Sequence, residues 1–393
     1  MAGDAEPMKK ALAFVVFLGL VSLFADLTYE GARSITGPFL ASLGASSLVV
    51  GLAVGLGEFA GYAVRLLSGL VADRTRRYWL LTFCGYAINL GAVPALALAS
   101  RWEWAVALMV LERLGKAIRS PARDALLSQA TAVTGHGKGF GLHELLDQIG
   151  AVAGPLVVAW ALAKGGSFGQ AFLVLGIPAA ASLGTLAVAR AVYSPKPESE
   201  KAPTSQSSSL PLSPQLRVVL VFVALHLLGF AHFQLVAYHC QVNGIFPTAS
   251  IPVLFALAMA VDGLLALPVG MLFDRVGLGS LRVGAVLAVP VTALTFSAAP
   301  WAAALGIALW GAAMAIQETI LKAAIAATSP QEGRGFAFGL YHAVAGCALF
   351  AGNTLFGVLY PAGYWPLLAF SATAQLAALG VLGVALRRGQ DQS

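Results

Sequence analysis

Apolar residues fill most of this chain in long blocks, and short polar segments separate the blocks. With a window of about 20 residues, the length that a helix needs to cross the hydrocarbon core of a bilayer, the sequence divides into twelve apolar segments. In the first half they are 11–42, 46–72, 78–99, 103–128, 138–162 and 169–191. In the second half they are 216–241, 249–273, 280–298, 301–327, 334–360 and 364–386. The pattern predicts an all-α membrane protein with twelve transmembrane helices.

A polar stretch separates the two sets of six segments. It reads SPKPESEKAPTSQSSSLPLSP, from Ser194 to Pro214, and Pro, Ser, Lys and Glu dominate it. A segment of this composition cannot bury a hydrophobic core, so it is typical of a flexible loop. We therefore expect an N-terminal six-helix bundle at 1–192, a cytoplasmic linker at 193–215 and a C-terminal six-helix bundle at 216–393.

The composition indicates that a bilayer is the solvent of this chain. Hydrophobic residues make up 58% of the 393 residues and charged residues 11%, and the mean hydropathy is +0.80. A soluble domain of ordinary composition carries about 25% charged residues, so this chain has too little polar surface to face water on all sides. Lys9 and Lys10 precede the first segment as in a signal peptide, but the segment is too long for one and is kept as a span.

Basic residues are distributed unevenly about the predicted spans. Most of the 24 Lys and Arg residues lie at helix ends and loops on one side, whereas only Arg101 and Lys164 lie on the other. Cytoplasmic loops carry such an excess, which predicts a multi-pass protein of the cell (inner) membrane with both termini in the cytoplasm. The net charge of +6 therefore indicates topology and contact with anionic lipid, not a nucleic-acid partner.

The two halves of the chain repeat each other. The pattern G-x-x-x-D-R occurs in GLVADRTRR (Gly69–Arg77) and again in GMLFDRVG (Gly270–Gly277), offset by 201 residues. GHGKGFGLH (Gly135–His143) aligns without gaps to GRGFAFGLY (Gly333–Tyr341), offset by 198. Two nearly equal offsets imply two six-helix units in the same order, which is the parallel-repeat plan of transporters whose site lies between their halves.

The repeated loops resemble the signature of the major facilitator superfamily, and the resemblance extends over nearly the whole chain. The matching positions are Gly69, Asp73 and Arg74 in the first copy and Asp274 and Arg275 in the second. Arg76 stands where the signature has a second Gly, which the second copy keeps as Gly277. The resemblance implies the family's two-bundle fold and a latch on its cytoplasmic side, because carboxylates can cap helix N-termini and arginines can pair across bundles.

A second pattern lies in the fifth span. Gly141, Gly150, Gly154 and Pro155 form G-x8-G-x3-G-P, which resembles the signature of the drug:proton antiporter branch of the superfamily. Val158 and Ala159 stand where that signature has two more glycines. Small residues let helix backbones approach closely, and proline bends a helix. The resemblance implies an antiporter.

Charged residues inside the first span predict proton coupling. Asp26, Glu30 and Arg33 in FADLTYEGAR fall at i, i+4 and i+7, on one face of a helix. A charge at the bilayer centre costs roughly 2.5–3.5 kcal/mol on insertion scales, so each such residue suggests a function. We expect Asp26, as first choice, or Glu30 to alternate between a protonated form and an ionised form paired with Arg113 or Arg33. The alternative is a static buried ion-pair network.

Other residues extend this proton-coupling hypothesis. Arg113, in the middle of the fourth span, resembles the arginine of the family's proton-linked signature R-x-x-Q-G, with Lys116 at the Gln place and Ala117 at the Gly place. Arginine does not lose its proton in proteins, so Arg113 can only be a partner of the carrier. Glu58, in the second span, is a further candidate carrier.

Polar and aromatic residues of the spans predict a substrate site. The candidates are Tyr29, Arg33, Glu112, Lys116, His143, Glu144, Asp147, Phe230, Gln234 and Asp262. The first half carries most of the charges, whereas the second half is mostly apolar and aromatic. Such unlike walls suit an amphipathic cargo, such as a lipophilic cation, a drug-like molecule or a lipid with a polar head.

The sequence contains no pattern typical of a metal site, a nucleotide site or an enzyme. Cys84, Cys240 and Cys347 are far apart, each within an apolar run, and we expect them to be buried hydrophobic residues rather than disulfides or zinc ligands. The chain also lacks a P-loop. We expect no metal, no cofactor and no catalytic residue.

Taken together, the patterns predict a proton-coupled secondary transporter that exports an amphipathic or lipophilic small molecule by alternating access and works as a monomer. Three alternatives stay open. The first is a lipid or glycolipid flippase, in which Glu30 and Arg33 would hold the head group. The second is an uptake symporter or uniporter. The third, of a different class, is a membrane receptor or scaffold that does not transport.

Overall fold

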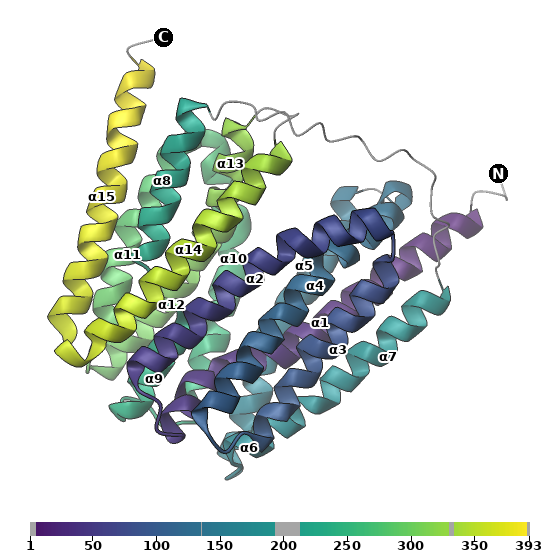
Figure 1. Ribbon diagram of the computed structural model, residues 1–393, viewed down its shortest axis with the longest axis horizontal. Helices are drawn as coiled ribbons and strands as arrows, with labels where there is room; N and C mark the ends of the chain where they lie inside the picture. The colour runs from purple at the N-terminus through teal and green to yellow at the C-terminus, as the bar shows by residue number, and fades with distance from the viewer. Residues whose placement is uncertain (1–4, 135, 193–212, 330–333, 391–393) are drawn as a thin grey trace. The chain divides into compact units, whose positions relative to one another are not determined.

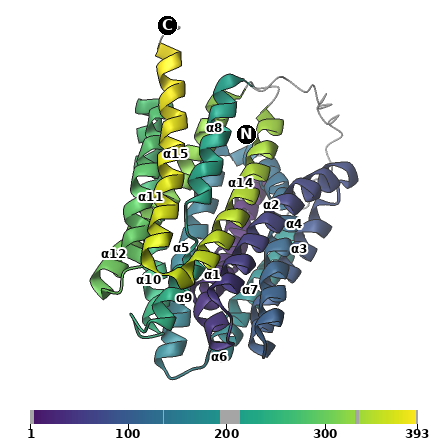
Figure 2. The ribbon, with the colours of Figure 1, turned by 60° about the vertical axis from the view of Figure 1, so that its left-hand side comes forward.

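The computed structural model describes residues 5–134, 136–192, 213–329 and 334–390, and these ranges contain helices and turns but no β-strand (Figures 1 and 2). The first half contains α1 (Ala5–Ser42), α2 (Ser47–Thr75), α3 (Tyr78–Ala95), α4 (Trp102–Thr134), α5 (His136–Ala163), α6 (Phe168–Val174) and α7 (Gly176–Val192). The second half contains α8 (Pro214–Leu228), α9 (Phe233–Val242), α10 (Ser250–Val276), α11 (Leu281–Thr295), α12 (Pro300–Ile316), α13 (Lys322–Thr328), α14 (Arg334–Leu359) and α15 (Tyr364–Gln390). Short 3-10 turns are η1 (Leu96–Leu98), η2 (Gly277–Ser280) and η5 (Tyr360–Ala362), and η3 (Gln317–Leu321) is a turn of π-helix.

The helices have the lengths and composition of membrane spans. Within the described ranges, ten helical segments are long and apolar enough to cross a bilayer, and one of them, Ser250–Thr295, contains both α10 and α11. α4 is not among the ten, because charged residues interrupt its apolar sequence. Its 33 residues nevertheless extend about 50 Å at 1.5 Å per residue. The prediction of an all-α membrane protein is confirmed, and the count of twelve spans stays a prediction.

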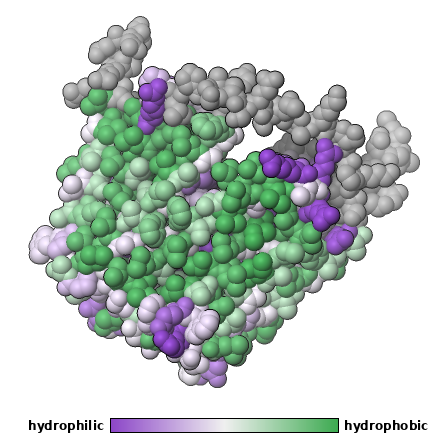
Figure 3. Space-filling model, in the orientation of Figure 1, coloured by the Kyte–Doolittle hydropathy of each residue, from purple (hydrophilic) through white to green (hydrophobic). Residues whose placement is uncertain are grey.

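The surface matches a lipid environment. On the face drawn in Figure 3, apolar residues cover most of the sides of the helices, and hydrophilic residues gather toward helix ends. Large apolar side chains such as Leu67 on α2 and Leu264 on α10 are mostly exposed. A patch of this extent would be costly in water, whereas it is the ordinary outer surface of a protein in hydrocarbon.

Contacts between Cα atoms divide the chain into two compact units. The first comprises Met1–Phe39, Ala63–Thr204 and Thr248–Ala256, and the second comprises Leu40–Tyr62, Ser205–Pro247 and Leu257–Ser393. In the first unit α3 packs against α4 and α7, and α4 packs against α5 (Figure 1). In the second unit α8 packs against α14 and α15, and α11 packs against α12 and α15 (Figure 2).

Some sequence expectations fall outside the described residues. Most of the predicted linker, 193–212, is not described, and the helix that follows begins at Pro214. Gly135 and Gly333, which open the second repeated motif, are not described either. The domain boundaries expected at 192 and 216 stay a prediction.

In the first unit, the backbones of α5 and α1 lie in close contact at two glycines of α5. A methyl group built on Gly150 would meet the carbonyl oxygen of Leu23, and one built on Gly154 would meet the carbonyl oxygen of Leu27. The same methyl on Gly150 would lie 3.1 Å from Cβ of Asp26. Two glycines of the predicted antiporter motif therefore set how close α5 lies to the charged stretch of α1.

The predicted seventh span, 216–241, is interrupted where α8 ends and α9 begins. Gly229 caps α8, and its N–H bonds to the carbonyl of Leu225 at 3.2 Å. A side chain at Gly229 would collide with Ala374 and Gln375 of α15. Phe230 N still donates to Leu227 O at 3.3 Å, and the backbone then leaves the helix until His232, which is the N-cap residue of α9. Hydropathy did not predict this break, because both halves and the residues between them are apolar.

The polar groups of this broken backbone are satisfied by side chains from three other helices of the second unit. Ser371 Oγ donates to Gly229 O at 2.9 Å, Trp310 Nε1 donates to Ala231 O at 3.0 Å, and His232 N donates to Asn353 Oδ1 at 3.0 Å. These side chains lie on α15, α12 and α14. Irregular backbone persists at membrane depth only where protein groups complete its hydrogen bonds in this way.

The two repeated loops share a backbone conformation. Arg76, after α2, has a φ of 51°, and Gly277, after α10, has a φ of 60°. Both residues therefore lie in the left-handed region, which glycine adopts freely and other residues adopt at a cost. This explains why the family signature has a glycine at this place, and it makes Arg76 the one non-glycine residue with positive φ in the described chain.

We expect Gly277→Ala to lower the free energy of unfolding by about 1 kcal/mol, because the left-handed conformation disfavours an L-residue by about that amount. The space around Gly277 is open, so no steric collision contributes. The measurement is thermal unfolding of the purified protein in detergent, followed by tryptophan fluorescence.

The matched control for this substitution is Gly380→Ala, in the interior of α15, where the space is also open but the backbone is helical. There alanine should stabilise the helix by up to about 1 kcal/mol. Equal shifts for the two variants would show that the backbone conformation at 277 carries no cost.

Candidate functional site

The first unit holds a cluster of buried charged residues on α1, α4 and α5. Asp26 and Glu30 are both buried on α1, and Arg33, one turn further on, is partly buried. Arg33 Nη1 lies 2.8 Å from Glu30 Oε1. The predicted common face of these three residues therefore holds, and Glu30 and Arg33 form a neutral pair within α1.

A second neutral pair lies on α4. Arg113 Nε is 3.5 Å from Glu112 Oε2. Asn89 on α3 holds the same glutamate, because its Nδ2 donates to Glu112 Oε1 at 2.7 Å and to the Glu112 carbonyl at 3.1 Å. Asn89 and Arg113 therefore bind different oxygens of the Glu112 carboxylate, Oε1 and Oε2.

Asp26 has no ion-pair partner among the described residues. Its side chain is only 5% exposed, and within the described part of the chain its Oδ1 has no hydrogen-bond partner. The charged groups that act on it most strongly are Asp147 of α5, Lys116 and Arg119 of α4, and Glu30. A buried, incompletely bonded carboxylate can exchange a proton at a moderate cost, because neither of its protonation states is held by a full set of bonds.

Two basic residues of α4 pack on aromatic rings instead of carboxylates. Lys116 Nζ lies 3.9 Å from the centre of the Tyr29 ring. The guanidinium of Arg119 lies 4.2 Å from the centre of the Tyr86 ring and 5.8 Å from that of Tyr29. Tyr29, predicted to bind substrate, is therefore in contact with a basic surface of α4, and Arg33 lies at 6.0 Å from the same ring.

A polar pocket of about 450 Å³ opens between α4 and α5. Its polar lining consists of Arg123, Asp124, His143, Glu144 and Asp147. Arg123 pairs with Asp124 at 2.8 Å and donates to Ser22 Oγ of α1 at 3.1 Å. His143 Nδ1 lies 3.8 Å from Asp147 Oδ2. The predicted substrate residues His143, Glu144 and Asp147 thus line one pocket. One of them, Asp147, is also among the charged groups that act on Asp26.

The remaining predicted polar residues belong to the second unit. Glu58 Oε1 lies 3.7 Å from His232 Nε2, and His232 Nδ1 lies 2.5 Å from Gln234 Oε1. Phe230, in the break between α8 and α9, stacks on Trp310 with ring centres 6.1 Å apart. Asp262 is buried on α10. Glu58 is therefore placed with the α8–α9 break and not in the unit that holds Asp26.

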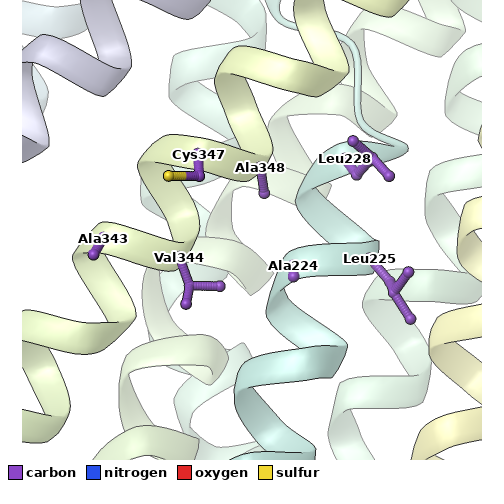
Figure 4. Close-up of a pocket in the computed structure, with 7 residues that line it drawn as sticks. All are labelled: Ala224, Leu225, Leu228, Ala343, Val344, Cys347 and Ala348. Atoms are coloured by element: carbon purple, nitrogen blue, oxygen red, sulfur yellow. The ribbon is translucent and has the colours of Figure 1, made fainter.

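An apolar pocket of about 440 Å³ lies between α8 and α14 in the second unit (Figure 4). Its walls are Ala224, Leu225 and Leu228 from α8 and Ala343, Val344, Cys347 and Ala348 from α14. The small side chains Ala343 and Ala348 of α14 leave the space open. A pocket of this volume and lining accepts an alkyl or aromatic group.

The latch residues lie toward the ends of α2 and α10, and the motif residues lie along α5. Asp73 and Arg74, at the end of α2, and Asp274 and Arg275, at the end of α10, are exposed, and Gly69 faces Pro121 of α4 at ordinary contact distance. The four motif positions of α5 differ. Gly150, Gly154 and Pro155 are buried, whereas Gly141 is exposed and lines the polar pocket.

Sequence reasoning missed Arg119 and misplaced two cysteines. Arg119 lies toward the end of the predicted fourth span, where no site residue was expected, and its side chain is 1% exposed. Its spacing from Lys116 and Arg123, i+3 and i−4, would have placed all three on one face of α4. Cys240 is buried as expected, but Cys84 and Cys347 are exposed, because apolar residues of a membrane span can face outward as well as inward.

Metal binding finds no support in the described residues, where no group of three or more His, Cys, Asp and Glu side chains could hold an ion. His232 and His239, which lie on one span, make separate contacts. His239 Nδ1 lies 2.9 Å from the Tyr360 hydroxyl. His239 is seven residues further along the chain than His232, which lies near Glu58.

Comparisons with known proteins match this architecture. A family model described as Major Facilitator Superfamily matches residues 18–249. An uncharacterized protein of Mycobacterium tuberculosis is 43% identical over 91% of this chain and 89% of its own length. An uncharacterized MFS-type transporter of Methanocaldococcus jannaschii is 26% identical over 88% of each chain.

Two further comparisons support less, because one covers only part of the chain and the other has low sequence identity. The multidrug resistance protein MdtH of Photorhabdus laumondii is 32% identical over 32% of this chain and 31% of its own. The crystal structure of a mutant of the nucleoside transporter NupG superposes with a TM-score of 0.79 over 94% of this chain and 99% of that chain, at 12% identity. At that identity the likeness concerns the fold alone.

Proposed function

Because the chain belongs to the major facilitator superfamily, whose fold and members are those of membrane transporters, we propose that it is a proton-coupled secondary transporter of an amphipathic small molecule. Alternating access, in which two bundles rock about a site, is the mechanism of this parallel-repeat plan. The residues that carry the proposal lie in the charged cluster of α1, α4 and α5.

The single observation behind the proton coupling is the state of Asp26. Glu30 and Glu112 each have a basic partner within 3.5 Å, whereas Asp26 is buried with one oxygen unbonded. A proton that binds to Asp26 changes the net charge of a buried region by one unit. We therefore propose Asp26 as the proton carrier. Glu30 is the second choice, because it is already paired with Arg33.

The proposed cycle follows from these neighbours. When Asp26 is ionised, its negative charge is set against the positive charges of Lys116 and Arg119. When Asp26 is protonated, that balance is lost, and the conformation or the ligand that compensates the two cations is favoured instead. Protonation and the state of the carrier are thus linked, which is what coupling requires.

An amphipathic cargo is supported by the chemistry of the two units. The first unit carries the charged cluster and the polar pocket between α4 and α5, and the second carries the apolar pocket between α8 and α14. Surfaces so unlike match the two ends of an amphiphile. A cargo that is polar throughout would leave the apolar pocket without a counterpart.

Export is the direction we propose first, because MdtH relatives are named for multidrug resistance. An uptake symporter is the second candidate, and a different observation favours it. Lys116 and Arg119 stand without carboxylate partners at ion-pair distance in the described chain, so a negatively charged cargo would bind where Asp26 acts, together with a proton.

The experiment is flux in proteoliposomes that contain the purified wild-type protein, with a pH gradient imposed in either direction. The probes are two amphipathic dyes, the cation ethidium and the anion 8-anilinonaphthalene-1-sulfonate. Uptake of one dye should follow the gradient, reverse when the gradient is reversed and stop when a protonophore is added. Gradient-independent flux would indicate a uniporter, and no flux of any probe in either direction would favour a non-transporting receptor.

A further inference from the structure

Two basic residues of α4, Lys116 and Arg119, lack an ion pair within the described residues. Lys116 and Arg119 lie one turn apart, and neither has a carboxylate oxygen within ion-pair distance in the part of the chain that the structure describes. Arg119 is 1% exposed, and its Nε and Nη1 have no hydrogen-bond partner there. An arginine this deeply buried is ordinarily bonded to a carboxylate or to several acceptors.

Aromatic rings stabilise these cations only in part. Tyr86 lies under the Arg119 guanidinium at 4.2 Å, and Tyr29 lies under Lys116 Nζ at 3.9 Å. The negative face of an aromatic ring attracts a cation, but it does not accept the N–H groups that water would have bonded. The loss of hydration exceeds what a ring returns when the cation is fully buried. Within the described residues, Arg119 therefore lacks the acceptors that its buried N–H groups need.

Lys116 and Arg119 outnumber the one acid that acts on both of them. Glu30 neutralises Arg33, and Glu112 neutralises Arg113. Asp26 is opposed by both Lys116 and Arg119. Asp147, another acid near Asp26, lies with Asp124 around Arg123 at the polar pocket. Taken by themselves, Lys116, Arg119 and Asp26 carry one positive charge in excess when Asp26 is ionised and two when it is protonated.

We propose that Lys116, Arg119 and Tyr29 form the binding site for an anionic group of the cargo, a carboxylate, phosphate or sulfate carried by an amphiphile. The unused N–H groups of Arg119 and the ammonium of Lys116 supply the donors such a group needs. The hydroxyphenyl ring of Tyr29 lies near both cations, at 3.9 Å from Lys116 Nζ and 5.8 Å from the Arg119 guanidinium. A cationic group at the same place would meet Lys116, Arg119 and Arg33 and be repelled.

This inference rests on the proposed transport function. It also predicts whether protonation of Asp26 strengthens or weakens binding of the cargo. The cargo anion and the ionised Asp26 compete for the same two cations, with Glu30 and Asp147 as the nearby acids that add to the negative charge. A proton on Asp26 ends the competition. The anion should therefore bind more tightly as the pH falls, so that cargo and proton are loaded together, which is the order of a symporter and favours the second of the two candidates above over export.

The test measures thermal unfolding of the purified full chain in a neutral maltoside detergent. The probes are octyl phosphate and octyltrimethylammonium, which share an alkyl chain and differ in charge, and inorganic phosphate as a free anion. We expect octyl phosphate to raise the unfolding temperature, more at pH 6 than at pH 8, and octyltrimethylammonium to leave it unchanged. Stabilisation by the cation in place of the anion would overturn the proposal.

Two further arms identify the source of the anion. An effect of inorganic phosphate equal to that of octyl phosphate would support a small free anion as the cargo group. Loss of the octyl phosphate effect in nanodiscs that contain phosphatidic acid, but not in nanodiscs of phosphatidylcholine alone, would support a lipid head group at the same donors.

Variants separate a binding role from a structural one. Arg119→Gln and Lys116→Gln should each weaken octyl phosphate binding at least tenfold, whereas the control Arg101→Gln, at an exposed ion pair with Glu103, should bind as the wild type does. Without ligand, Arg119→Gln should unfold at the same or a higher temperature, because it removes an unpaired buried charge. A lower temperature with unchanged anion binding would show that Arg119 is structural and would overturn the proposal.

The two proposals can fail separately. Anion binding that depends on Lys116 and Arg119, in a protein whose flux ignores the pH gradient, would support the anion site and contradict proton coupling. Gradient-driven flux of ethidium that persists in the Lys116→Gln variant would support proton coupling and contradict the anion site.

Discussion

Replacing Asp26 by asparagine should abolish proton-driven accumulation of cargo while exchange of cargo down its own gradient continues. Asparagine keeps the size of the side chain and cannot bind or release a proton near neutral pH. The variant therefore mimics the protonated state permanently, and Lys116 and Arg119 lose the charge that opposes them. Accumulation against a gradient should fall by an order of magnitude or more in proteoliposomes, whereas counterflow, which needs no net proton movement, should remain.

Glu103→Gln is the matched control, since Glu103 is an exposed acid at the start of α4 that pairs with Arg101 at 2.6 Å. It removes one carboxylate without touching the buried cluster and should leave both assays unchanged. Glu30→Gln should have an intermediate effect, because it leaves Arg33 without its partner. Full gradient-driven accumulation in Asp26→Asn would rule out Asp26 as the carrier, and with Glu30→Gln also active the cluster would be a static network.

The second large effect is expected from Gly150→Ala, which should disrupt the contact between α1 and α5. The new methyl group would meet the carbonyl oxygen of Leu23 and lie 3.1 Å from Cβ of Asp26, so one of the two helices must move. Overpacking of this kind costs about 1–3 kcal/mol, and here it also displaces the proposed proton carrier. We expect a lower unfolding temperature and a loss of gradient-driven transport. Gly154→Ala, which meets Leu27 in the same way, should behave alike.

Gly141→Ala is the control for stability, because it adds the same methyl group on the same helix where nothing lies within 4 Å. It should leave the unfolding temperature unchanged or raise it slightly, since alanine favours helix by up to about 1 kcal/mol over glycine. The three glycines of the motif would then divide into two that set helix packing and one that does not. Equal tolerance of alanine at 141 and 150 would contradict the close approach described for α5.

The helices could be predicted from hydropathy because lipid imposes one rule on every span. A run of about 20 apolar residues must form a helix to satisfy its own backbone in hydrocarbon. The rule is silent on what happens inside a run, so it did not show the break at 229–232 or the π-turn at 317–321. Only tertiary partners such as Trp310 and Asn353 make the break possible, and they lie far away in the sequence.

The charged site was predicted in part. Spacing along α1 put Asp26, Glu30 and Arg33 on one face, and the pair between Glu30 and Arg33 is present. Depth along α4 pointed to Arg113 as the partner of Asp26, whereas Arg113 lies beside Glu112, and Lys116 and Arg119 act on Asp26. The depth of a residue in the membrane can be estimated by counting residues along the helix. The rotation of a helix about its axis depends on packing against other helices, which cannot be predicted from one sequence.

The break between α8 and α9 also has a consequence for how the protein is made. Synthesis runs from the N-terminus, so this segment leaves the ribosome before α12, α14 and α15, which carry Trp310, Asn353 and Ser371. Until those later segments arrive, three backbone groups of the nascent chain have no protein partner in the bilayer. The C-terminal half must therefore be made almost to its last helix before the backbone of its first span can complete its hydrogen bonds, and a chain shortened before Ser371 would leave the carbonyl of Gly229 without this partner.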